Sequence, residues 1–119
     1  MTRNTLTTEQ DAEFDARMRH WQARLGLLDW RIVRGSRKTT AMADVKINYG
    51  SRLASYVTGN FGAEGVSSET IDAVARHEAL HLLLADLVHI AGLSEPDAVT
   101  LEAAEHRVVN VVEKLLGAP

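Results

Sequence analysis

Two histidines and a glutamate in the segment His77–His81, which reads HEALH, are the residues of this chain with the clearest capacity for chemistry. On a helix, side chains four positions apart project from the same face one turn apart, so the imidazoles of His77 and His81 can reach one metal ion. Glu78 then stands beside the ion without binding it, where a general base is needed. Because three such polar groups are costly to bury together without a role, we interpret the segment as a site for a divalent metal ion.

A catalytic zinc ion has three protein ligands and an open position for water, so the two histidines need a third donor. The chain has no cysteine, which leaves a carboxylate or another histidine. Glu105 lies within the apolar sector of a C-terminal helix, Glu102 lies on its edge, and His106 lies about 100° beyond Glu105. A carboxylate in an apolar face is costly unless it is paired or binds a metal. Glu105 is therefore the predicted third ligand, with Glu102 and His106 as alternatives, and Glu102 is otherwise expected to orient a ligand histidine.

This site predicts hydrolysis of a peptide bond. One Zn²⁺ ion held in this way lowers the pKa of its water toward neutrality and polarises a carbonyl oxygen. Glu78 is expected to take the proton from that water and to pass it to the leaving nitrogen. A peptide or protein substrate is expected to lie extended along an exposed strand edge beside the helix. The candidate donors to the developing oxyanion are His106, Tyr49 and Tyr56.

Size and composition limit the alternatives. The 119 residues are enough for a single domain spanning 1–119, and the apolar and charged fractions of 45% and 24% are ordinary for a globular protein. The net charge of −3 gives no global attraction to nucleic acid or to anionic lipid, so neither is an expected partner. The N-terminal segment lacks the apolar core of a signal peptide, and the apolar run Leu80–Leu93 is too short and too polar to span a bilayer. A cytoplasmic protein is the expectation.

Periodicity predicts the elements that must position the site. Thr7 and Gln10 form a capping-box pattern, and Gly26 is a helix stop, so a first helix is expected between them. From Leu28 the apolar period changes to two. Strands are therefore expected over Leu28–Ile32, Ala41–Tyr49 and Leu53–Thr58, and their short connections favour an antiparallel meander.

The second half of the chain is predicted to be helical. Ser67 or Ser68 caps a helix that carries HEALH two to three turns from its start and continues to Gly92. Leucines after HEALH make its surface apolar nearly all round, as is typical of a helix at the centre of a domain. A final helix follows. The predicted fold is α+β: an N-terminal helix, a three-stranded mainly antiparallel sheet, a buried HExxH helix and a C-terminal helix.

With these elements, the whole chain resembles the zincin metallopeptidases, and among them the gluzincins, whose third zinc ligand is a glutamate on a later helix. It is similar to small metallopeptidases encoded by phages and prophages and to the minimal soluble peptidases called minigluzincins. The likeness is carried by the strand Trp30–Ile32, by HEALHLLL, and by EAAEHRVVN from Glu102 to Asn110. The resemblance implies a zincin-like fold and a zinc-dependent peptidase activity. It implies His77, His81 and Glu105 as ligands and Glu78 as the base.

Two other interpretations stay open. A non-catalytic zincin-like protein could serve a binding or regulatory role in a phage structural assembly or a toxin and antitoxin context, although a structural site has no use for Glu78 as a base. A SprT-like domain, which acts near DNA, would use a third histidine in place of the glutamate, and His106 stands beside Glu105. The acidic balance of the chain argues against that second alternative.

Overall fold

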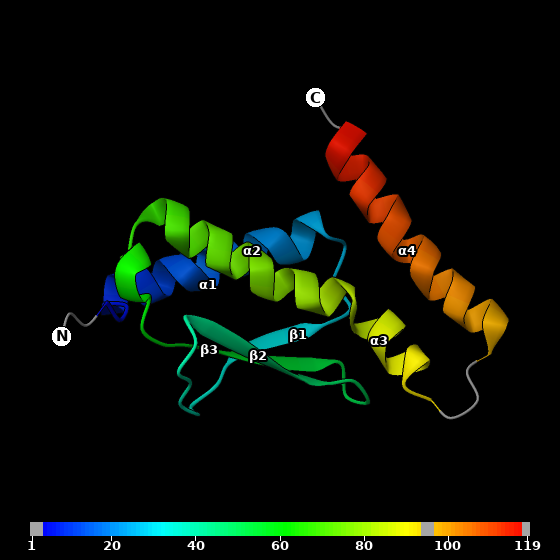
Figure 1. Ribbon diagram of the computed structural model, residues 1–119, viewed down its shortest axis with the longest axis horizontal. Coiled ribbons are helices and arrows are strands. Elements are labelled where there is room, and N and C mark those ends of the chain that lie inside the picture. The colour runs from blue at the N-terminus through cyan, green and yellow to red at the C-terminus, as the bar shows by residue number, and fades with distance from the viewer. Residues whose placement is uncertain (1–3, 94–96, 118–119) are drawn as a thin grey trace.

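The computed structural model describes residues 4–93 and 97–117 and confirms the α+β class. Helices α1 (Thr8–Arg24) and α2 (Ser68–Leu83) lie together on one face of a three-stranded sheet, as Figure 1 shows. The strands are β1 (Arg31–Arg34), β2 (Ala43–Asn48) and β3 (Leu53–Thr58). A short 3₁₀ helix η1 (Gly62–Glu64) precedes α2, and α3 (Ala85–Ala91) and α4 (Ala98–Gly117) follow it.

Helix α1 forms as its sequence predicts. The Thr7 hydroxyl accepts from the Gln10 backbone nitrogen at 3.2 Å, and the Gln10 side chain accepts from the Thr7 backbone nitrogen at 2.9 Å, which completes the capping box. The helix ends before Gly26, whose φ of +70° is a left-handed conformation that suits glycine. Its buried face, with Phe14 and Met18 fully covered, packs against α2 and the sheet.

The sheet is mixed, and the predicted meander is wrong. Its order is β1-β3-β2: β2 pairs with β3 antiparallel over six residue pairs, and β1 pairs with β3 parallel over four. The connection between β1 and β2 spans residues 35–42, which is long enough to carry the chain past the position that β3 later fills. This strand order places β2, and not β3, at the edge of the sheet beside α2.

The first strand also begins later than its alternation predicts. Leu28 is 76% exposed, because the chain is still in a turn at this position. Leu27, Trp30 and Ile32 are the residues that enter the core. Strand β3 has the predicted bounds, and Arg52, with a φ of 52°, occupies the turn before it.

The helix that carries HEALH is interrupted where the sequence predicted continuity. The hydrogen-bonded helix α2 closes at Leu84, and α3 begins again at Ala85. Leu80, Leu84 and Val88 are 37%, 38% and 67% exposed, so this surface is not buried all round. One face of α2 packs against α1 and the sheet, and the helix is buried on that face alone.

Helix α4 leans away from the sheet and packs on α3 (Figure 1). Ala104 is buried, and Val108, Val111 and Leu115 pack against the core cluster. Arg107 adds polar contacts to Asp86 on α3 and to Asp29 before β1. None of the helices in the described part of the chain has the length and apolarity that crossing a membrane requires.

Candidate metal centre

Helix α2, which carries the site, begins with a capping box at Ser67. The Ser67 hydroxyl accepts from the Thr70 backbone nitrogen at 3.2 Å, and the Thr70 side chain accepts from the Ser67 nitrogen at 2.8 Å. The buried stripe then contains Ile71, Ala75 and Ala79. Because one helical turn takes about 3.6 residues, the positions of His77 and His81 fall on the opposite face.

His77, Glu78 and His81 form one compact group. A ligand atom from each lies within 4.8 Å of the others, and among the described residues no other side chain joins a group of this kind. The two imidazole rings are 5.0 Å apart between centroids and inclined at 83°. Both histidines are exposed, so two ring nitrogens can meet at one divalent ion while its remaining positions face solvent. The donor set therefore fits such an ion.

Glu78 differs from its neighbours because it is buried, with 5% of its surface exposed. Burial raises the pKa of the Glu78 carboxyl, the two histidines oppose that rise, and Asp44 adds to it. Gln22, the other buried polar side chain of the described residues, donates to the backbone oxygens of Leu27 and Trp30. The Glu78 carboxylate accepts no hydrogen bond within residues 4–93 and 97–117, and its oxygens are not fully shielded from solvent, so they stay accessible to a water molecule.

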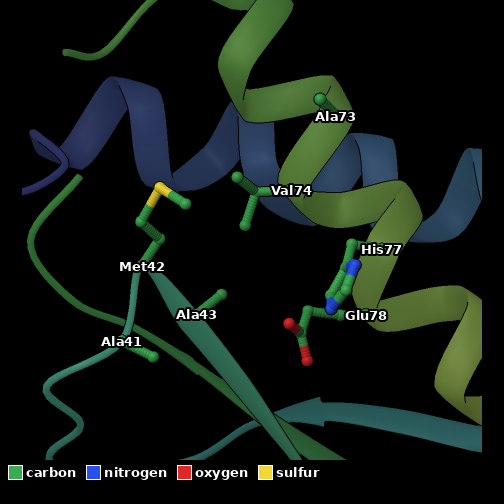
Figure 2. Close-up of a pocket in the computed structure, with 7 residues that line it drawn as sticks. All are labelled: Ala41, Met42, Ala43, Ala73, Val74, His77 and Glu78. Atoms are coloured by element: carbon green, nitrogen blue, oxygen red, sulfur yellow. The ribbon is translucent and has the colours of Figure 1, made fainter. Parts of the chain in front are cut away.

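Two hollows flank this group along the line where α2 and α3 meet β2. The first, of about 370 Å³, is lined by His77, Glu78 and apolar side chains of α2 and the start of β2, and is called here the His77 hollow. Figure 2 shows the Glu78 carboxylate and the His77 ring on the α2 side of it, with Met42 and Ala43 opposite. The second, the His81 hollow, measures about 300 Å³. Its lining is Ile47, Tyr49, His81, Leu84, Ala85, Val88 and His89.

The structure does not bring Glu105 to the histidines. Glu105 is exposed on α4 and is not part of the compact group. The stripe of α4 that packs on the core contains Ala104, Val108 and Val111. At about 100° per residue, Glu105 lies about 90° from the centre of that stripe, whereas the sequence pattern placed it within the apolar sector. The difference arises because Val112 is 39% exposed and Val111 takes the inward position.

The alternative ligands on α4 also point outward. Glu102 and His106 are exposed, and the Nε2 atom of His106 lies 3.7 Å from a carboxylate oxygen of Glu102. At about 100° per residue both lie more than about 120° from the packed stripe of α4. Neither residue therefore orients a histidine of α2 in this structure.

The two tyrosines predicted as oxyanion donors lie in different parts of the structure. Tyr56 is 1% exposed and donates from its hydroxyl to Asp15 at 2.6 Å, on the core side of the sheet, so the expectation that it serves the site is wrong. Burial and the Asp15 carboxylate raise the pKa of Tyr56 well above its usual range. Tyr49 does line the His81 hollow, where its ring stacks on His89 at 3.8 Å. Burial, together with Asp86, raises the pKa of the Tyr49 hydroxyl.

The apolar lining of the hollows could not be recognised from the sequence. Met42 and Val74 border the His77 hollow, yet each belongs to an ordinary apolar pattern of a strand or a helix. His89, whose ring stacks on Tyr49 in the His81 hollow, carries no spacing signal that links it to His77 or His81. The helix break at Leu84 brings α3 against the end of β2. The residue types around Leu84 do not predict this break.

Comparisons of the chain with protein-family models, with curated proteins and with solved structures give no significant match.

Proposed function

We propose that this protein is a metal-dependent hydrolase of peptide bonds, with His77 and His81 as metal ligands and Glu78 as the general base. The observation that carries the proposal is the contrast within the group: two exposed imidazoles stand beside a glutamate that is buried overall and whose carboxylate accepts no hydrogen bond from the described residues. A raised pKa on such a carboxyl suits a group that must accept and release a proton. This combination is expected of a catalytic site more than of a packing cluster.

A divalent ion bound by the two imidazoles, with zinc as the usual occupant of such sites, would supply Lewis acidity for a carbonyl group and for water. Glu78 performs the proton transfers. Its carboxylate takes one proton from the attacking water as the oxygen bonds to the carbonyl carbon. It then delivers that proton to the nitrogen as the C–N bond breaks, which leaves a carboxylic acid and an amine.

The sheet edge provides a binding surface for an extended substrate. Strand β2 has β3 on one side and, in the described part of the chain, no further strand on the other, and α2 packs beside it. A peptide that adds to this edge gains backbone hydrogen bonds, while its alternate side chains enter hollows. The His77 hollow and the His81 hollow lie on either side of the ligand group, so a peptide along β2 would pass the Glu78 carboxylate.

Replacing Glu78 by Gln tests the role of this residue. If Glu78 is the base, E78Q keeps zinc affinity within a few-fold of the wild type, since neutral Gln leaves both imidazoles in place. Its peptide hydrolysis is expected to fall at least about 100-fold. Zinc binding by calorimetry and cleavage of a quenched fluorescent peptide library measure the two effects. H77A and H81A are the matched controls, and both are expected to lose zinc and activity together.

Two results would contradict the proposal. Equal turnover by E78Q and the wild type would reject the assigned base. A large loss of zinc affinity in E78Q would make Glu78 a ligand, which favours a non-catalytic binding protein. That second candidate is favoured by one observation, because the Glu78 oxygen lies as close to the imidazole nitrogens as a ligand would.

A further inference from the structure

The charges of this chain are sharply divided along its length. Residues 31–58 contain six of the 13 Lys and Arg residues but one of the 16 acidic residues, Asp44. This segment therefore carries a formal charge of +5, and the remainder of the chain must carry −8 to reach the net charge of −3. The overall charge hides a basic sheet joined to acidic helices.

Strand alternation sends part of this charge to the sheet face that has no helix on it. Ile32, Ala54 and Tyr56 are buried on the side of α1 and α2. Side chains alternate between faces, so Arg31 on β1 and Lys46 on β2 project from the opposite side. Figure 1 shows that both long helices of the first 83 residues, α1 and α2, lie on one side of the sheet.

Arg37 extends the same surface from the connection between β1 and β2. Its guanidinium donates to the Ser55 hydroxyl and to the Ser55 backbone oxygen, each at 2.9 Å, so it lies flat on the outer side of β3. It also stands 3.6 Å from the Asp44 carboxylate. Lys38 follows it in the chain and is exposed. Arg31, Arg37, Lys38 and Lys46 together are called here the basic sheet face.

Of the six cations in residues 31–58, only some are paired with acidic residues of the chain. Arg34 pairs with Asp11, and Arg52 pairs with Asp29 and Asp86, so those two cations serve the fold. Within the described residues, by contrast, Arg31, Lys38 and Lys46 form no ion pair, and all three are exposed. Their charge is available to a partner.

The surroundings of these cations select the kind of partner. The nine exposed large apolar side chains of the described residues lie in loops and on the helices, and none is on the basic sheet face. Protein interfaces and membrane surfaces both use apolar anchors, which this face lacks. It also lacks an exposed aromatic ring on which an unpaired base could stack. Contacts to a phosphate backbone need cations alone.

The spacing of the cations favours an extended polyanion over a single phosphate group. Arg31 and Lys46 are separated by β3, which puts them about 10 Å apart across the strands. With Arg37 lying over β3 between them, the cations form a broad surface and not a single pocket, so successive phosphates of a duplex can meet several of them at once. We propose that the basic sheet face binds the phosphodiester backbone of double-stranded nucleic acid without reading its sequence.

Salt dependence is the quantitative consequence of this proposal. Three to four phosphate contacts give a slope of about −3 in a plot of log affinity against log salt concentration. The test uses the full chain and a fluorescein-labelled 20-base-pair DNA duplex of arbitrary sequence, with anisotropy measured from low to moderate NaCl. Wild-type protein is expected to bind with that slope, and equally well with or without EDTA, because the face does not include the metal centre.

Charge reversal on the face, matched to reversal elsewhere, identifies the surface. The double variant R31E/K46E is expected to bind the duplex at least about 10-fold more weakly, with the salt slope reduced by about 2. The variant R24E/K114E makes the same change in net charge at exposed positions on α1 and α4 and is expected to lose much less. If R31E/K46E does not fold, as judged by circular dichroism, R31Q/K46Q replaces it, with the same order of effects.

Three results would overturn the proposal. The first is absence of salt-dependent duplex binding by the wild type. The second is an equal loss in the face variant and in the matched control, which would reveal a net-charge effect only. The third is binding to vesicles that contain phosphatidylserine without binding to the duplex. Each of these is independent of whether Glu78 catalyses hydrolysis, so failure here and failure of the proposed hydrolase remain distinguishable.

Discussion

At the scale of single residues, Glu78 and its neighbouring histidines show how one turn of helix can hold a buried carboxylate beside two exposed imidazoles. Position 78 falls on the buried side of α2 and positions 77 and 81 on the exposed side, although all three share one turn. The carboxylate is therefore held in a poorly hydrated place, while the imidazoles stay open to an ion and a substrate. The HEALH spacing creates this division wherever the helix is half-buried.

Asp72, one turn before the site, gives a pH-dependent prediction. It accepts from Arg17 at 2.6 Å and from the Trp21 indole at 2.8 Å, which ties α2 to α1. Burial tends to raise the pKa of the Asp72 carboxyl, but these hydrogen bonds and the nearby arginines hold it below its ordinary value of 3.8. A lowered pKa stabilises the fold above about pH 4, and this stabilisation is lost as the pH falls through the folded-state pKa.

We therefore expect Asp72→Asn to lower the free energy of unfolding by about 1 kcal/mol at pH 7, a modest value because the pair is partly exposed. The difference from the wild type should shrink as the pH falls below the folded-state pKa of Asp72, because the wild-type carboxyl then also loses its charge. Urea unfolding over a series of pH values from 7 downward measures it. Glu113→Gln, at an exposed position of α4, is the control and should change little. A difference for D72N that persists unchanged at low pH would contradict the argument.

At the scale of elements, the approach of the connection 35–42 to the end of β3 shapes the His77 hollow. Gly59 donates from its backbone nitrogen to the Met42 oxygen at 2.8 Å. A Cβ atom at position 59 would lie 2.2 Å from the Ala41 backbone oxygen, so only glycine permits this approach. Ala41 and Met42 both line the hollow.

Gly59→Ala is expected to destabilise the fold by about 2 kcal/mol, because backbone atoms must move to admit the methyl group. Gly50→Ala is the matched control: the nearest atom to its Cβ would be 3.8 Å away, so it should be nearly neutral. Thermal unfolding of both variants measures the contrast. Similar melting temperatures for G59A and the wild type would show that β2 is not fixed by this contact.

At the scale of the whole molecule, α4 makes the chain more extended than a compact domain. The radius of gyration is 15.6 Å, whereas a compact domain of this length has about 13.5 Å. Arg107 fixes α4 in this position by donating to the Asp86 carboxylate at 2.8 Å and to the Gly26 backbone oxygen at 3.1 Å. The exposed side of α4, which carries Glu105, is turned away from these contacts.

Small-angle scattering tests this arrangement. We expect the radius of gyration of the dilute protein to stay unchanged, within about 0.5 Å, when zinc is added, since the packed stripe of α4 already contacts the core. A contraction of about 1 to 2 Å, toward the value for a compact domain, would contradict this. If Glu105→Ala prevented that contraction, α4 would supply the third ligand that the sequence pattern predicted.

The sequence by itself determined whatever depends on neighbours along the chain. The capping residues at Thr7 and Ser67, the bounds of β3, and the meeting of His77 with His81 all follow from spacings of three or four residues or from strand alternation. These are local effects, because each turn of helix or pair of strand positions fixes its own side-chain directions.

Tertiary structure decided everything that depends on packing between distant segments. It placed β3 between β1 and β2, broke the helix at Leu84, turned Glu105 outward, and brought Arg31 and Lys46 to the same face of the sheet. The apolar pattern of α4 admits more than one inward face, and a net charge of −3 says nothing of where the charges lie. Several packings satisfy the same local periodicity, and the choice among them depends on the area that each buries across the whole molecule.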